Sequence, residues 1–189
     1  IAGNLVGVSL GLQSSSNAVL GNFIGTDASG TRALGNIAAQ RQGGGVNIFE
    51  SQGNRVGDVT PGSGNVIAFH RGGGVDIVQS SQRNQVRGNS IFNNDVLGIE
   101  LGNAGSGLTP NDPGDSDTGP NGLQNFPLIT GIRSVGGTVR ISGTLNSTMS
   151  SAFTLDFYAN AQCAASGHGE GQRYLGTSSV VTGADGNTL

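Results

Sequence analysis

Short runs of alternating apolar and polar residues recur along the N-terminal half of the chain. Four of these runs share the order Gly, apolar, polar, apolar, and they begin at Gly7, Gly45, Gly74 and Gly98. Because a period of two places alternate side chains on the same face, each run predicts a short strand with one apolar face. Gly74 and Gly98 are 24 positions apart, and this interval is the basic period of the repeat.

Two further kinds of run lie between the Gly-initiated strands. Runs of the order Asn-x-Val begin at Asn17, Asn54 and Asn84, and runs of the order Gly-Asn-x-Ile follow them. The spacing is kept between repeats, since Asn65 precedes Val75 by ten residues and Asn89 precedes Ile99 by the same ten. The pattern predicts a unit of three short strands. Stacking such units at about 4.8 Å would bury a continuous column of Val, Ile and Leu.

Asparagines recur at the turn before the third strand of each unit. Asn22, Asn65 and Asn89 occupy equivalent positions, so stacked units would place them one above another. Each side-chain amide would then donate to the next side-chain carbonyl, which satisfies polar groups inside the turn. The alternative is that they are ordinary turn asparagines. Their role is architectural in both cases.

Composition agrees with a β structure rich in tight turns. The 189 residues include 35 Gly without a Gly-X-Y period, and charged residues make up only 11%. No apolar run approaches the roughly 20 residues of a membrane helix, so we expect no membrane insertion. The nine basic residues are all Arg and are scattered over a chain of net charge −3. That distribution argues against a nucleic-acid partner.

Four segments carry a resemblance to a known group of proteins. They are GNFIGTDASGTRALGN (21–36), VTPGSGNVIAFHRGGGVDI (59–77), NDPGDSDTGPNGLQNFPLI (111–129) and DFYANAQCAASGHGEGQRYLG (156–176). They resemble the bacterial right-handed parallel β-helix repeat proteins of the pectin-lyase-like class. The resemblance implies an all-β fold with a right-handed parallel β-helix of about four coils over residues 1–126. Because this fold carries lyases, hydrolases, adhesins and inert spacers, the resemblance selects no activity.

The pattern changes near residue 126. Alternating segments lie near 128–132, 138–145, 153–158 and 173–181. They predict antiparallel strands, and the resemblance implies an immunoglobulin-like β-sandwich segment over residues 127–189. Residues 183–189 read as a hairpin turn entering a strand with no continuation, so this sandwich would be incomplete. We expect the chain to be part of a longer protein, or to receive a strand from a neighbouring molecule.

The polar positions of the Gly-initiated strands supply candidate chemistry. These positions are Ser9, Asn47, Asp76 and Glu100. Asp76 and Glu100 would be neighbours at about 5 Å, a separation similar to that of the carboxylates of retaining glycosidases. However, the chain has no Trp and only two Tyr, whereas ligand pockets are usually lined with aromatic side chains. Three interpretations stay open: a catalytic pair, a sugar- or cation-binding set, or a solvated surface row. The binding set would comprise Asn47, Asp76, Glu100 and Arg71.

Residues 111–121 form the most concentrated polar cluster. Asp112, Asp115, Asp117 and Asn121 supply oxygen atoms at short intervals in a loop rich in turn formers. Calcium takes six to eight oxygen ligands from such loops. The spacing differs from that of an EF-hand, because no Glu closes it. The alternative to a calcium site is a capped, Pro-containing linker between two domains.

These observations favour a non-catalytic module that is secreted or displayed on a bacterial cell surface. We expect a rigid repeat rod that presents loops for adhesion or assembles with itself, with polysaccharide as the ligand class and calcium as the only candidate cofactor. The alternative is a polysaccharide lyase or glycoside hydrolase acting on the face of Asp76 and Glu100. A filament subunit is the third interpretation.

Overall fold

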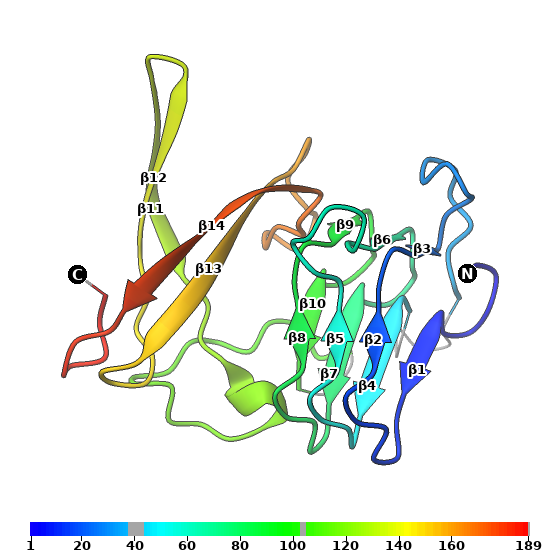
Figure 1. Ribbon diagram of the computed structural model, residues 1–189, viewed down its shortest axis with the longest axis horizontal. Helices are drawn as coiled ribbons and strands as arrows, with labels where there is room; N and C mark the ends of the chain where they lie inside the picture. Colours follow the sequence, from blue (N-terminus) through cyan, green and yellow to red (C-terminus); the bar gives the residue numbers. More distant parts are fainter. Residues whose placement is uncertain (38–43, 103–104, 189) are drawn as a thin grey trace. The chain divides into compact units, whose positions relative to one another are not determined.

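The computed structural model describes residues 1–37, 44–102 and 105–188 (Figure 1). Regular structure in these ranges is almost entirely β, as predicted. No helix in the described ranges has the length and apolar character of a membrane span. The chain divides into two compact units. Unit 1 comprises residues 1–109, 119–121 and 156–176, and unit 2 comprises residues 110–118, 122–155 and 177–189.

Unit 1 contains three parallel sheets whose strands alternate along the sequence (Figure 1). Sheet A has the order β1 (Val8–Leu10), β4 (Val46–Phe49), β7 (Val75–Val78), β10 (Ile99–Leu101). Sheet B has the order β2 (Ala18–Val19), β5 (Arg55–Val56), β8 (Gln85–Val86). Sheet C has the order β3 (Phe23–Ile24), β6 (Val66–Ala68), β9 (Ser90–Phe92). The chain therefore passes through A, B and C three times before it enters β10, and we call each passage a layer.

The parallel register brings equivalent apolar residues together. In sheet A the aligned residues are Val8, Val46, Val75 and Ile99 in one row and Leu10, Ile48, Ile77 and Leu101 in another. Most of these residues join buried Val and Ile of sheets B and C in one core. Each fully buried side chain of this size stabilises the fold by about 1.5–3 kcal/mol. Ile99 is aligned but 45% exposed, because β10 is the last strand of sheet A.

The glycines before β1, β4 and β7 are required by the closeness of the layers. A Cβ atom on Gly45 would lie 2.2 Å from the carbonyl oxygen of Gly74, and one on Gly74 would lie 2.6 Å from that of Gly98. Such contacts are far shorter than real Cβ atoms make, and the atom they meet is rigid backbone. The repeated glycine is therefore a packing requirement as well as a mark of the strand start.

Replacing one of these glycines tests the packing. We expect Gly45→Ala to destabilise unit 1 by roughly 1–3 kcal/mol, the range for overpacking a tight interior. The added methyl group would meet the Gly74 carbonyl and the side chain of Ile67. Urea unfolding followed by circular dichroism measures the loss. Gly131→Ala is the control, because a Cβ there meets nothing within 4 Å. Equal destabilisation by both substitutions would contradict the explanation.

The corner before sheet C carries a ladder of side-chain amides. Asn22 Nδ2 donates to Asn65 Oδ1 at 3.1 Å, and Asn65 Nδ2 donates to Asn89 Oδ1 at 2.8 Å. These are the asparagines that the sequence predicts to stack. The backbone N–H groups of Asn22 and Asn65 donate to the same two oxygens. Each layer is thus tied to the next by its backbone and its side chain together.

A second ladder lies at the corner before sheet B. Asn17 Nδ2 donates to Asn54 Oδ1, and Asn54 Nδ2 donates to Asn84 Oδ1, both at 3.0 Å. Asn121 is the last member: its Oδ1 accepts from the backbone of Asn84 at 3.0 Å, and its Nδ2 donates to the Asn84 carbonyl at 2.7 Å. The sequence analysis offered Asn121 as a candidate calcium ligand, with a linker between domains as the alternative. In the structure, the oxygen and the nitrogen of its side-chain amide are both bonded to the backbone of Asn84 in the ladder.

The third corner, before sheet A, contains a histidine in the place of an asparagine. Asn4 N donates to Asn36 Oδ1, Asn36 N donates to His70 Nδ1, and His70 N donates to Asn94 Oδ1, all at 3.0–3.1 Å. Asn94 Nδ2 then donates to a carboxylate oxygen of Glu170 at 2.7 Å. His70 is 1% exposed, and burial lowers its pKa to about 4.

The depressed pKa of His70 makes stability depend on pH. Between pH 6.5 and 4 the unfolded chain binds a proton at His70 that the folded chain does not bind, so the free energy of unfolding falls as pH decreases through this window. The loss reaches roughly 3 kcal/mol, since one pKa unit corresponds to about 1.4 kcal/mol. His70→Asn removes this titration and should flatten that part of the stability profile.

Denaturant unfolding at several pH values between 4 and 7 checks this prediction. His168→Asn serves as the control, because it removes the other histidine of the chain, which is exposed. The explanation is wrong if His70→Asn keeps the wild-type dependence, or if His168→Asn flattens the profile to the same extent.

Residues of the segment 156–176 close the last layer of unit 1. Gly171 pairs with Ile91 of β9 in an antiparallel bridge, with N···O distances of 2.9 and 3.0 Å. The Arg87 guanidinium donates two hydrogen bonds to the Asp156 carboxylate, at 2.7 and 2.6 Å. Bidentate pairs of this kind are stronger than single neutral hydrogen bonds. The segment therefore satisfies backbone and charged groups where the parallel stack stops.

Unit 2 contains the antiparallel hairpin formed by β11 (Leu128–Val135) and β12 (Thr138–Thr144). A further two-stranded sheet consists of β13 (Ala152–Ala159) and β14 (Arg173–Val181), and the division between the units runs through both strands. The structure thus contains the strands expected in this part of the chain. The sequence suggested one boundary after residue 126, whereas the compact units interleave along the chain.

Candidate functional site

Sheet A aligns the polar row that the sequence analysis singled out. Ser9 pairs with Asn47, Asn47 pairs with Asp76, and Asp76 pairs with Glu100. The row comes from the alternation of the Gly-initiated strands, since the neighbouring positions of each strand face the core. Parallel pairing without a register shift then places these four side chains on the same face.

The two acidic residues of this row are buried, which differs from the solvated row considered from sequence. Asp76 is 0% exposed and Glu100 is 1% exposed. The Glu100 carboxylate accepts hydrogen bonds from the backbone N–H groups of Gly105 and Gly107, at 2.9 and 2.8 Å. It also accepts from the Ser106 hydroxyl at 3.2 Å. Glu100 therefore anchors the loop that follows β10.

Asp76 lies against the backbone that precedes its own strand. A Cβ atom on Gly73 would lie 2.2 Å from Asp76 Oδ1. The carboxylate is consequently enclosed on this side by main chain, with no room for a sugar ring between them. The loop that follows β10 covers Glu100, and alternation within a strand carries no information about such a loop.

Arg71, the fourth member of the suggested binding set, is exposed in the turn before β7. In the described part of the chain, the ion pairs join Arg55 to Asp58 and Arg87 to Asp156. Neither involves Arg71. Unlike the two acids, the Arg71 side chain is open to solvent, so the structure does not unite the predicted set into one site.

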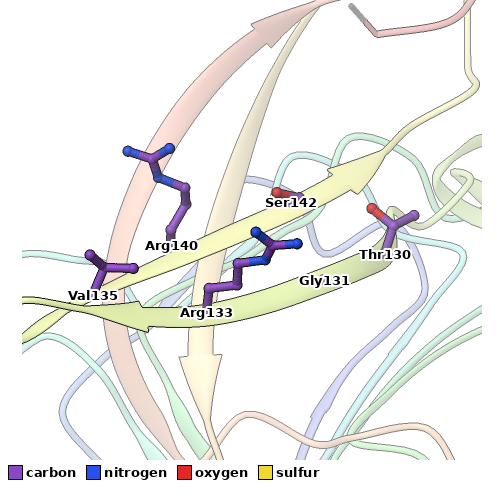
Figure 2. Close-up of a pocket in the computed structure, with 6 residues that line it drawn as sticks. All are labelled: Thr130, Gly131, Arg133, Val135, Arg140 and Ser142. Carbon is purple, nitrogen blue, oxygen red and sulfur yellow. The ribbon is translucent and has the colours of Figure 1, made fainter.

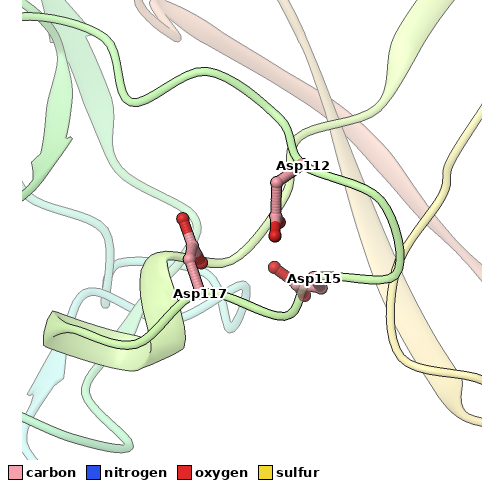
Figure 3. Close-up of side chains that lie close together, drawn as sticks. All are labelled: Asp112, Asp115 and Asp117. Atoms are coloured by element: carbon pink, nitrogen blue, oxygen red, sulfur yellow. The ribbon is translucent and has the colours of Figure 1, made fainter.

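The loop of unit 2 brings together three of the four residues suggested for calcium. Asp112, Asp115 and Asp117 each offer a carboxylate oxygen, and these oxygens lie within 4.8 Å of one another. Figure 3 shows the three carboxylates turned toward a common centre inside the loop. Pro113 and Gly114 lie between the first two aspartates, and Gly114 has a φ of 73°, a conformation that favours glycine. The chain can therefore reverse direction tightly enough to gather them.

The three carboxylates differ in their protein partners. The Ser116 hydroxyl donates to Asp112 Oδ2, and this hydrogen bond is the main cause of the lowered pKa of Asp112. Asp115 accepts from the backbone of Asn125 and from the side chains of Gln124 and Ser147. Burial raises the pKa of Asp117, and the charges of Asp112 and Asp115 raise it further.

Two oxygens of this cluster are left for another ligand. Asp112 Oδ1 and Asp117 Oδ1 are shielded from solvent and have no hydrogen-bond partner in the described structure. Charged oxygens in this state are costly unless a cation or donor approaches them. The arrangement can therefore hold a hard cation through Asp112 and Asp117, while Asp115 chiefly holds the loop together.

Sequence reasoning missed several residues that determine the architecture. The ladder of Asn17, Asn54 and Asn84 could have been predicted from the sequence, because these asparagines begin the Asn-x-Val runs at equivalent positions. His70 and Glu170 carried no such signal. Each of these two residues bonds to an asparagine of the third ladder although it is not an asparagine itself.

A scan against protein families and a search of curated proteins found no match to the chain.

Proposed function

We propose that the chain is a non-catalytic extracellular module, a right-handed parallel β-helix followed by a β-sandwich segment. Its stiff stack would present loops at a bacterial surface, bind carbohydrate and associate with other copies. The observation that carries the proposal is the structural use of its polar residues: the three ladders hold successive layers together, and Glu100 holds the loop that follows β10.

Stiffness follows from the way these interactions repeat. In every layer the side chains at the corners bond to the layer beneath, so moving one layer breaks hydrogen bonds at three places. The buried side-chain amides of the ladders before sheets B and C have hydrogen-bond partners, and satisfied networks of this kind rigidify a structure. A scaffold of this kind keeps its loops at fixed spacing, which suits adhesion or spacing better than it suits a cleft that closes on a substrate.

The acids of sheet A favour the same conclusion. A general acid and base must reach the substrate within hydrogen-bonding distance. Glu100 is already engaged by three donors from residues 105–107. Asp76 is enclosed beside Gly73. These positions support a structural role for both carboxylates and leave the lyase or hydrolase alternative without an accessible pair.

A panel of neutral and acidic polysaccharides tests this proposal. We expect retention of the protein on at least one polysaccharide, and no product in reducing-end or unsaturated-product assays. Product formation that is lost in Asp76→Asn and kept in Asp58→Asn would establish the enzyme alternative. Thermal unfolding of both variants separates lost activity from lost folding. Asp58 is a suitable control because its hydrogen bond with Thr60 is exposed.

Self-association is supported by the hairpin of unit 2. Ile129, Ile132 and Val139 are exposed, and the cross-strand register places them on one face. An apolar sheet face open to water is a liability that proteins usually cover. We propose that another copy of the chain covers it. Sedimentation velocity would show dimers or larger species, and a monomer at all concentrations would remove this part of the proposal.

Calcium binding at Asp112 and Asp117 is a further part of the proposal. The support is the pair of unpartnered, shielded oxygens and the approach of three carboxylates within 4.8 Å. The cation would stiffen the loop without taking part in chemistry. Oxygen ligands from a tight loop fit the preference of calcium.

Thermal unfolding with and without calcium checks this site. We expect calcium to raise the unfolding midpoint of the wild type, because a ligand that binds the folded state stabilises it by mass action. Asp117→Asn should lose most of this shift. Asp185→Asn, which alters an exposed aspartate elsewhere in unit 2, should keep it. An equal shift in both variants would show that calcium does not bind at this loop.

A further inference from the structure

The hairpin β11–β12 has two chemically different faces. Paired residues of an antiparallel ladder share a face, and successive residues alternate. Ile132 pairs with Ile141 on the apolar face described above, whereas the adjacent pair, Arg133 and Arg140, lies on the opposite face. This second face has no role in the proposed function so far.

Arg133 and Arg140 stand directly opposite each other. Like charges at such cross-strand positions destabilise a hairpin. They are also the only basic residues in the sequence of unit 2. In the described part of the chain, neither guanidinium has an ion pair or a hydrogen bond that would offset the repulsion. The arrangement lacks a structural explanation within unit 2 and becomes favourable when an anion lies between the two groups.

The same face is hollowed around the two arginines. A hollow of about 450 Å³ is lined by Thr130, Gly131, Arg133, Val135, Arg140 and Ser142. Figure 2 shows both guanidinium groups on the same side of the hairpin, with the Thr130 and Ser142 hydroxyls farther along it. A β-bulge interrupts the register between Ile129 and Gly131 at this point. Bulges of this kind often re-aim side chains beside binding sites.

We propose that this face of the hairpin binds the carboxylate groups of an acidic polysaccharide. A guanidinium presents a planar fork of N–H donors that matches a carboxylate. Two of them side by side fit a uronate carboxylate. The hydroxyls of Thr130 and Ser142 supply donors and acceptors for sugar hydroxyls, and Val135 offers an apolar contact to a ring.

The lining favours a uronate chain over nucleic acid. Single-stranded nucleic acids are held by aromatic side chains that stack on the bases, and no aromatic residue lines this hollow. The inference rests on the proposed function and deepens it, because it names the class of carbohydrate and the place where it binds.

Titration calorimetry with oligogalacturonate measures the binding. We expect Arg133→Gln and Arg140→Gln each to weaken binding about tenfold, which corresponds to the loss of one charge-assisted contact. Arg140→Glu should abolish it, because the new carboxylate pairs with Arg133 across the strands. Arg32→Gln is the matched control, since Arg32 is an exposed arginine in unit 1. Thermal unfolding verifies that the hairpin variants fold.

Three further ligands decide between the outcomes. A neutral galactan, a sulfated heparin oligosaccharide and single-stranded DNA are titrated under the same salt conditions. Equal binding of heparin or DNA would overturn the carboxylate assignment in favour of general attraction of polyanions. Binding of oligogalacturonate that all variants keep would overturn the site and leave the proposed function intact. Cleavage of oligogalacturonate would instead overturn the non-catalytic function, whether or not the arginines bind it.

Discussion

The backbone pairing between successive layers is the constraint on which the rest of unit 1 depends. Parallel strands without a register shift place each residue over its counterpart one strand spacing away. Each side chain must therefore be compatible with the side chain at the equivalent position of the next layer. Val and Ile side chains pack into one column, and asparagine side chains bond to one another. Glycines leave room for the carbonyl group of the next layer.

Features that depend on this self-matching were open to prediction from the sequence. Gly74 and Gly98 fixed the period, and Asn65 and Asn89 fixed the corner, so the sheet A register and one amide ladder followed from spacing alone. Features that depend on chain segments outside the repeat did not follow. The burial of Glu100 is one example, because residues 105–107 close over it.

The candidate sites show the same division. The ladder asparagines and Glu100 have structural partners inside unit 1, and Asn121 ends the ladder before sheet B. Unit 2 contains two features without an internal explanation: the shielded oxygens of Asp112 and Asp117, and the two facing arginines. We interpret unit 1 as the scaffold and unit 2 as the part that carries recognition.

The antiparallel contact of Gly171 with β9 also has a bearing on growth of the stack. The hydrogen bonds of an antiparallel pair are spaced differently from those of the parallel ladder that ends at β9. At the edge of sheet C the N–H and C=O groups of Ile91 are both bonded to Gly171, so they are not available to a further parallel strand. Another copy could therefore extend sheet C only after this contact is displaced.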